Sequence, residues 1–287
     1  MIRLYTLGYK GFYALTQLNN KQKLYVSEVV IARDNAIQAD YFNETKDFCQ
    51  KNNIVFFERG KEEISAAEYS IAIGWRWLIN DAKKLLVFHD SLLPRYRGFN
   101  PLVTALINGD LEIGLTALLA SEEYDRGPII GQKKIKIAYP IKIKEAIEKI
   151  SELYAQLLIE LIEKIEKNTI SENLQKEEDA TYSLWRDEED YFINWNDSAQ
   201  NIKRFIDSVG FPYNGAKTIL DSVPVRIFDA SAEEDVFIEN RCPGKVIFKR
   251  ENNLIITCGN GLLNVREFYD DLGNRIDFSN KFRLRFK

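Results

Sequence analysis

Short apolar runs alternate with longer amphipathic segments over the first half of the chain. Five runs rich in valine, isoleucine and leucine predict strands at residues 2–7, 26–31, 54–57, 70–73 and 85–88. Between the second and third of these, residues 39–49 have the spacing of a helix with one polar face. Strands alternating with helices are typical of βαβ units. The pattern therefore predicts a mostly parallel sheet with helices on both faces.

Two further apolar runs, residues 115–119 and 129–137, follow each other too closely for a crossover helix. Because parallel strands need such a crossover, we expect an antiparallel pair at the edge of the sheet. Apolar residues then recur at helical spacing from Ile143 to Ile165, which predicts one long helix packed on the sheet. Together these elements predict an α/β, Rossmann-like N-terminal domain.

A polar tract follows this half of the chain. Residues 168–180 contain few apolar side chains, so we expect domains at 1–180 and 181–287. In the second domain we predict a helix at 199–209 and short strands at 223–228, 244–248, 253–258 and 262–268. Asn260-Gly261 is a strong hairpin signal. The second domain should therefore be a small β-rich, OB-like barrel.

Composition excludes several classes of protein. The 287 residues carry a net charge of −4, with a pI near 5.4, which argues against broad binding to a phosphate backbone. The three cysteines are widely spaced and form no CxxC pair, so we expect reduced thiols, a cytoplasmic location and no metal site. No apolar run approaches the roughly 18 residues of a membrane span, and the N-terminus lacks the apolar core of a signal peptide.

One stretch holds the only histidine of the chain. His89 opens the sequence HDSLLPRYRG, and Gly114-x-Thr116 and then Asp125-x-Gly127 follow it. One imidazole, a turn rich in donors and a later carboxylate together suggest a catalytic site. For His89 alone, the alternative is a core histidine beside a basic turn. For Asp125 alone, it is a turn residue.

These motifs, in this order and at these separations, resemble the folate-dependent formyltransferases. That family includes methionyl-tRNA formyltransferase and the sugar-nucleotide N-formyltransferases. The resemblance covers nearly the whole chain, because residues 186–195 and 212–216 are similar to landmarks of the family's C-terminal domain. It implies formyl transfer from 10-formyltetrahydrofolate to a primary amine. Asp125 would draw a proton from the amine, and His89 would donate to the oxyanion or to the departing folate nitrogen.

The resemblance also implies binding residues. A pterin pocket would be lined by Trp77, Leu78, Ile79, Ser121, Glu122, Glu123 and Tyr124. For Trp77 and its neighbour Trp75, aromatic packing at a strand end is the alternative. Thr116 is expected to support the loop. Substrate phosphates would meet Lys10, Arg97 or Arg186, although Arg97 could instead bond its own loop, and Trp185 would stack on a base or pack at the domain junction.

One position departs from the family's pattern. The family carries asparagine two residues before the histidine, where its amide polarises the formyl carbonyl, and here that residue is Val87. Loss of one such donor typically costs about 10²–10³ in rate. Three interpretations stay open: Asn100 or an ordered water replaces the amide, the enzyme is slow or transfers another group, or the chain is a non-catalytic ligand-binding relative. Phe99, where some sugar-modifying members have a basic residue, is a second departure.

Charge also suggests the acceptor. Residues 231–235 and 270–271 place acidic side chains on the C-terminal domain, where tRNA binding would require basic surface, although residues 281–287 are basic. We therefore expect a nucleotide-linked amino sugar, in particular a dTDP-linked deoxy sugar for a surface glycan. Methionyl-tRNA is the alternative acceptor. An exposed sheet edge or the β-rich domain could pair two chains as a homodimer.

Overall fold

The computed structural model describes residues 1–35, 37–80, 83–250, 253–278, 281 and 283–287. The chain forms two compact units. Unit 1 comprises Met1–Leu102, Leu111–Ile137 and Glu145–Trp185, and unit 2 comprises Val103–Asp110, Ala138–Lys144 and Arg186–Lys287. The division expected at residue 180 differs from this one, because two short segments of the first half belong to unit 2 and the polar tract belongs to unit 1.

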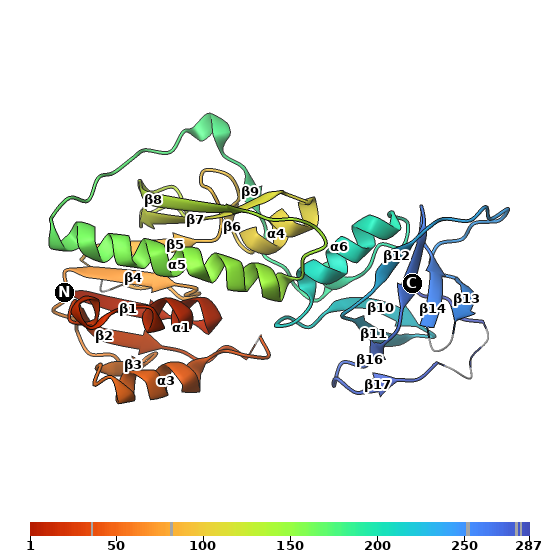
Figure 1. The fold of residues 1–287 in the computed structure, drawn as a ribbon, viewed down its shortest axis with the longest axis horizontal. Coiled ribbons are helices and arrows are strands. Elements are labelled where there is room, and N and C mark those ends of the chain that lie inside the picture. Colours follow the sequence, from red (N-terminus) through yellow and green to blue (C-terminus); the bar gives the residue numbers. More distant parts are fainter. Residues whose placement is uncertain (36, 81–82, 251–252, 279–280, 282) are drawn as a thin grey trace. The chain divides into compact units, whose positions relative to one another are not determined.

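A seven-stranded sheet forms the centre of unit 1 (Figure 1). Its strands are β1 (Ile2–Thr6), β2 (Val26–Ile31), β3 (Phe56–Glu58), β4 (Tyr69–Ile73), β5 (Leu85–His89), β7 (Glu112–Leu119) and β8 (Ile129–Lys136). They lie in the order β3-β2-β1-β4-β5-β7-β8. The first five are parallel, whereas β7 is antiparallel to both of its neighbours. The predicted parallel sheet with an antiparallel edge pair is confirmed.

The helices of the first half are α1 (Gly8–Thr16), α2 (Asn20–Lys23), α3 (Phe42–Lys51), α4 (Pro101–Asn108) and α5 (Ile143–Glu166). The ring of Tyr154 on α5 lies 5.4 Å from that of Phe88 on β5. Gly11 of α1 lies so close to Thr6 that a Cβ on it would crowd that side chain. Ile73 of β4 lies opposite Thr6 on one side and opposite Phe88 on the other, so the three side chains point to the same face of the sheet. α1 and α5 therefore cover the same face.

The opposite face carries one row of side chains across four strands. Val30, Tyr5, Ala72 and Val87 are successive register partners, and the first three are buried together. Trp75 and Ile79, from the chain after β4, pack on this row with Leu85. The alternation of strands and helices predicts a second helical layer on this face. Over this row, the segment with Trp75 and Ile79 covers the sheet instead.

Both faces of the central strands are buried, since every residue of β1 and β4 is buried. This is the burial expected of parallel strands covered on two sides.

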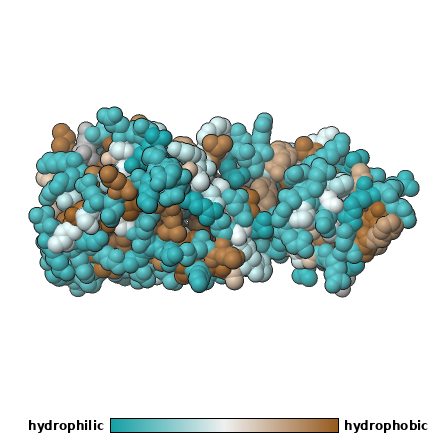
Figure 2. Space-filling view, turned by 90° about the horizontal axis from the view of Figure 1, so that it is seen from above, coloured by the Kyte–Doolittle hydropathy of each residue, from teal (hydrophilic) through white to brown (hydrophobic). Residues whose placement is uncertain are grey.

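On the face seen in Figure 2, hydrophilic side chains predominate and apolar patches lie between them. Among the described residues, no helix has both the length and the apolar character needed to cross a bilayer.

Unit 2 contains two four-stranded sheets, ordered β10-β11-β16-β17 and β12-β15-β14-β13. Phe286 bridges to Leu220 in the first sheet, and Arg285 bridges to Lys245 just before the second. The C-terminal segment thus links the two sheets on one side. The hairpin predicted at Asn260-Gly261 joins β14 to β15, so the antiparallel β-rich prediction is confirmed.

The bounds of these strands are β10 (Ala216–Leu220), β11 (Val223–Ile227), β12 (Ser231–Glu233), β13 (Val246–Arg250), β14 (Asn253–Thr257), β15 (Leu262–Val265), β16 (Phe268–Tyr269) and β17 (Arg275–Ile276). They follow η2 (Glu189–Tyr191) and α6 (Ala199–Val209). α6 begins at a side-chain cap, where Ser198 Oγ accepts from the backbone N–H of Asn201 at 3.2 Å. The predicted bounds of this helix agree with the structure.

Candidate active site

His89 is the last residue of β5, at the carboxyl edge of the parallel strands. This edge is where ligands bind in open α/β sheets. The side chain of His89 is only 8% exposed, and it points to the same face as Val87 two residues earlier. The sheet therefore presents one imidazole at its ligand-binding edge.

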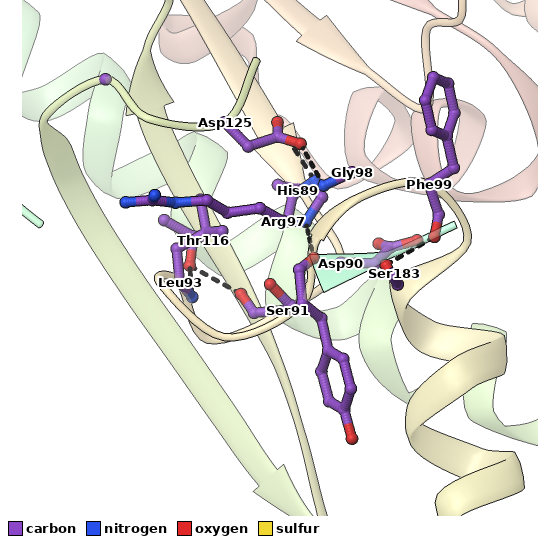
Figure 3. A network of polar contacts seen from close by, with 12 residues as sticks. His89, Asp90, Ser91, Leu93, Arg97, Gly98, Phe99, Thr116, Asp125 and Ser183 are labelled. Atoms are coloured by element: carbon purple, nitrogen blue, oxygen red, sulfur yellow. Dashed lines mark hydrogen bonds and ion pairs between the residues drawn. The ribbon is translucent and has the colours of Figure 1, made fainter. Parts of the chain in front are cut away.

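Two partners fix the imidazole (Figure 3). Nε2 lies 2.8 Å from the backbone carbonyl oxygen of Tyr96, and Nδ1 lies 3.5 Å from a carboxylate oxygen of Asp125. A carbonyl oxygen can only accept, so Nε2 carries a proton. The nitrogen that can gain or release a proton is therefore Nδ1, which faces the carboxylate.

Asp125 is held from its side chain and from its backbone. Its second carboxylate oxygen accepts from the backbone N–H of Gly98 at 2.8 Å. Its φ of 59° is left-handed, a conformation that aspartate tolerates better than most residues. The turn also needs Gly127, because a Cβ there would overlap the carbonyl oxygen of Leu119. Asp125 is thus a turn residue, and its carboxylate faces the imidazole.

The turn after His89 is held by side-chain bonds to its backbone. Thr116 lies opposite His89 on β7, donates to the carbonyl of Ser91 at 2.7 Å, and accepts from the N–H of Leu93 at 3.1 Å. Gln132 adds bonds to Leu93 and to Thr116, each at 2.9 Å. Thr116 supports this loop, as predicted.

Arg97 is buried, and its side chain is 1% exposed. Its guanidinium donates to Gln175 Oε1 at 2.9 and 3.1 Å and to both carboxylate oxygens of Glu177 at 2.8 and 2.9 Å. Hydrogen bonding to Glu177 raises the pKa of Arg97, and the guanidinium in turn lowers the pKa of Glu177. The guanidinium is therefore enclosed and its charge is paired, and its contact with a substrate phosphate stays a prediction.

Lys10 is also paired. Its ammonium group bonds Asp90, the residue after His89, and lies 5.7 Å from the centroid of the Tyr154 ring. The hydroxyl of Tyr154 donates to the other oxygen of Asp90 at 2.5 Å. Lys10 therefore connects α1 to the turn after His89. Its contact with a substrate phosphate stays a prediction.

The predicted pterin-pocket residues occupy two segments. Trp75 lies edge-on to Tyr5 and to Trp77, with ring centroids 5.1 and 5.2 Å apart, so both tryptophans pack at a strand end. Contact of Trp77 with a pterin stays a prediction. Ile79 packs on the Val87 face, whereas Leu78 is 75% exposed. The indole N–H of Trp75 is buried without a hydrogen-bond acceptor among the described residues.

The second segment, residues 121–124, is exposed. Ser121 donates to the carbonyl of Glu123 at 2.7 Å, and the carboxylate of Glu123 pairs with Arg126 at 2.5 Å. Tyr124 is 72% exposed, and Glu122 is exposed beside it. Because Asp125 directly follows, this loop reaches the carboxylate of the candidate site. Its contact with a pterin stays a prediction.

Trp185 and Arg186 belong to different units, since unit 1 ends at Trp185 and the long segment of unit 2 begins at Arg186. The indole of Trp185 is 60% exposed, and Arg186 is half-buried. Their roles in substrate binding stay predictions.

The polar tract predicted as a boundary contains residues that the sequence did not assign to the site. We call residues 173–183, which include η1 (Glu177–Asp179) and β9 (Tyr182–Ser183), the strap. The strap begins where Asn173 exchanges two backbone hydrogen bonds with Ile129, at 2.8 and 2.9 Å. It ends where β9 pairs with β6 (Arg97–Gly98). It therefore joins the turn after His89 to the loop of Asp125.

A pocket of about 440 Å³ lies in unit 2, where its lining includes Asn194, Trp195, Arg241 and Arg285. None of the residues described above around His89 lines this pocket. We place the candidate chemistry at His89 rather than in this pocket, because Arg241 is already bonded to Asp235 and to three backbone carbonyls. The imidazole and carboxylate, by contrast, meet at the carboxyl edge of a parallel sheet.

At the carboxyl edge of the sheet, the paired imidazole and carboxylate can move protons to and from a bound substrate. The chain belongs to the formyl transferase family: residues 16–162 match the formyl transferase domain, and residues 186–283 match the formyl transferase C-terminal domain.

A curated relative and two solved structures are similar to this chain. A methionyl-tRNA formyltransferase of Thermodesulfovibrio yellowstonii is 37% identical over 177 residues, which are 62% of this chain and 55% of that protein. The N-formyltransferase from Helicobacter canadensis, in complex with folinic acid and dTDP-3-aminofucose, has a TM-score of 0.67 at 16% identity over 93% of this chain and 99% of that one. HypX from Aquifex aeolicus in complex with tetrahydrofolic acid has a TM-score of 0.64 at 20% identity over 94% of this chain and 44% of that one. The match to the Thermodesulfovibrio yellowstonii protein therefore spans about half of that protein's length.

Replacing Arg97 by methionine should lower the free energy of unfolding by about 2 kcal/mol, because the variant loses hydrogen bonds between a buried cation and the strap. Denaturant unfolding measures the change. Arg95→Met is the matched control: Arg95 is the exposed arginine of the same turn, and its loss should cost under about 0.5 kcal/mol. Unchanged stability of Arg97→Met, with a raised KM for a phosphorylated substrate, would instead support the phosphate-binding role.

Proposed function

We propose that the protein transfers a formyl group from 10-formyltetrahydrofolate to the primary amine of a nucleotide-linked amino sugar. The observation that carries the proposal is the pairing of His89 Nδ1 with the Asp125 carboxylate at 3.5 Å. Folate ligands bound to HypX and to the Helicobacter enzyme support the donor, because both proteins share this fold.

The proposed reaction needs no oxidant or metal. The nitrogen of the neutral amine attacks the formyl carbon, a C–N bond forms, and the carbonyl electron pair moves to oxygen. Asp125 takes the proton that the amine loses and passes it to Nδ1 of His89, which gives it to the departing N10 as the C–N10 bond breaks. The products are a formamide and tetrahydrofolate. Since Nε2 is committed to the Tyr96 carbonyl, both proton transfers use the Nδ1 side of the ring.

Three observations support a small acceptor. The chain is acidic overall, with a net charge of −4. The fold extends over 99% of the N-formyltransferase from Helicobacter canadensis that was solved with dTDP-3-aminofucose. Three unpaired thiols suit a cytoplasmic enzyme that acts on nucleotide sugars. A homodimer is part of the same proposal.

Methionyl-tRNA is the second candidate acceptor, and two observations favour it. The 37%-identical relative is named methionyl-tRNA formyltransferase. In unit 2, Arg283, Arg285 and Lys287 are exposed at alternate positions, while Leu284 and Phe286 between them are buried. This row of cations is the kind of surface that binds phosphates. Part of the acidity expected to oppose tRNA is also neutralised, because Asp271 bonds Arg226 at 2.7 Å.

His89→Asn should lower formyl transfer at least about 10²-fold, because the ring nitrogen that exchanges protons with Asp125 is lost. The assay incubates 10-formyltetrahydrofolate with a panel of nucleotide-linked amino sugars and detects the mass gain of one formyl group. Matching thermal unfolding of the variant and the wild type controls for folding. Full activity in the folded variant would remove His89 from the mechanism.

Val87→Asn tests whether the missing amide limits the rate. Asparagine at this position of β5 would place a donor two residues before His89, on the same face. We expect a rise in kcat of about tenfold or more. A well-placed oxyanion donor raises kcat by about 10²–10³, and the neighbours of the introduced amide are not arranged to orient it. Val87→Thr is the control for polarity without an amide. No gain in either variant would mean that another donor already fills this role.

The two acceptors are separated by salt dependence. If methionyl-tRNA is the substrate, Arg285→Gln should weaken its binding and reduce the slope of log K against log salt by about 1. If a sugar nucleotide is the substrate, the same variant should leave kcat/KM within about twofold, because the cation row is then not used. Formylation of both acceptors by the wild type would contradict the exclusive assignment to sugars.

A further inference from the structure

Every hydrogen-bonding function of the Gln175 side chain is used. Its amide nitrogen donates to the backbone carbonyls of Asp125, at 2.7 Å, and Gly127, at 2.8 Å. Its amide oxygen accepts twice from the guanidinium of Arg97. A rotated amide would turn its oxygen toward two carbonyl oxygens and its N–H groups toward a cation. Only one orientation of the side chain is therefore compatible with its surroundings.

Gln175 itself is held in place from three directions. Arg97 fixes its oxygen, and Glu177 fixes Arg97 through a two-oxygen ion pair. The strap on which Gln175 lies is anchored upstream, where Asn173 pairs with Ile129. Such support is what keeps a side chain in one position while its neighbours fluctuate. The side chain that bonds the Asp125 turn is therefore itself held in one position.

The position of Asp125 requires such a support. Its left-handed backbone is disfavoured for a residue with a Cβ, by roughly 1–2 kcal/mol. The Nδ1–Oδ1 distance of 3.5 Å is already long for a hydrogen bond, so a small rotation of the turn would separate the pair. The amide of Gln175 donates to the backbone carbonyls of residues 125 and 127 in this turn. It therefore restrains the backbone from which the carboxylate projects.

We propose that Gln175 is a positioning residue, which directs the carboxylate of Asp125 at Nδ1 of His89 by holding the carbonyls of Asp125 and Gly127. The proposal deepens the proposed formyl transfer and rests on it for its kinetic consequence. Gln175 touches neither the imidazole nor, in this assignment, any reacting atom. Its effect passes through Asp125 alone.

Gln175→Met removes all four hydrogen bonds at nearly constant length. We expect kcat to fall about 10- to 100-fold, because a misplaced catalytic group costs up to about 10² in rate, while KM for donor and acceptor stays within about twofold. Lys176→Met is the matched control, since this neighbouring strap residue is exposed, and its kcat should be unchanged. If Gln175→Met does not fold, Gln175→Glu retains the bond to Arg97 and still loses both donors to the turn.

Combination with Asp125→Asn tests the route of the effect. If Gln175 acts through Asp125, Gln175→Met should reduce kcat no further in the Asp125→Asn background. Multiplying losses would overturn the proposal. An unchanged kcat in folded Gln175→Met would also overturn it.

A spectroscopic readout separates this inference from the proposed function. The chain has one histidine, so the ring ¹⁵N resonances belong to His89 alone. Gln175→Met should move the Nδ1 resonance in the same direction as Asp125→Asn, and Lys176→Met should leave it in place. If the wild type formylates no acceptor, the proposed function fails while this measurement still decides the positioning role. A resonance unmoved by Gln175→Met refutes that role even in an active enzyme.

Discussion

One hydrogen bond from the His89 side chain to the backbone decides how the candidate site can work. The carbonyl oxygen of Tyr96 lies 2.8 Å from Nε2 of His89, and it can only accept a hydrogen bond. The ring is therefore oriented, and its exchangeable position is turned toward Asp125. Tyr96 can offer this carbonyl because the turn after His89 is fixed by Thr116 and by the strap. The chemistry thus depends on a loop geometry that the tight turn and the sheet edge impose together.

Much of the fold could be predicted from the sequence, because apolar periodicity reports burial directly. The parallel strands, the antiparallel edge pair and the long helix from Ile143 all follow from it. The aromatic cover over Val87 could not be predicted in this way. Trp75 and Ile79 lie in a segment without helical or strand periodicity, and they pack on strands that are distant in the sequence.

The site could be predicted only where a motif encodes it. His89, Asp125 and the supporting Thr116 were found because their spacing is diagnostic. The partners of Lys10 and Arg97 could not be predicted, because a sequence does not show which carboxylate a cation will meet. Their carboxylates, Asp90 and Glu177, lie 80 positions away in each case. Gln175 was missed because a polar tract has the composition of a linker, although this one bonds the backbone carbonyls of the Asp125 turn.

The replacement of the family's asparagine by Val87 is best understood with its neighbours. Val87 continues a buried row with Tyr5 and Ala72, so the position contributes to packing beneath Trp75. Among the described residues the indole N–H of Trp75 is buried without an acceptor, and burying a donor in that state costs about 1–3 kcal/mol. Val87 and Trp75 therefore belong to one packed apolar face, and an amide introduced at position 87 would have to find room within that packing.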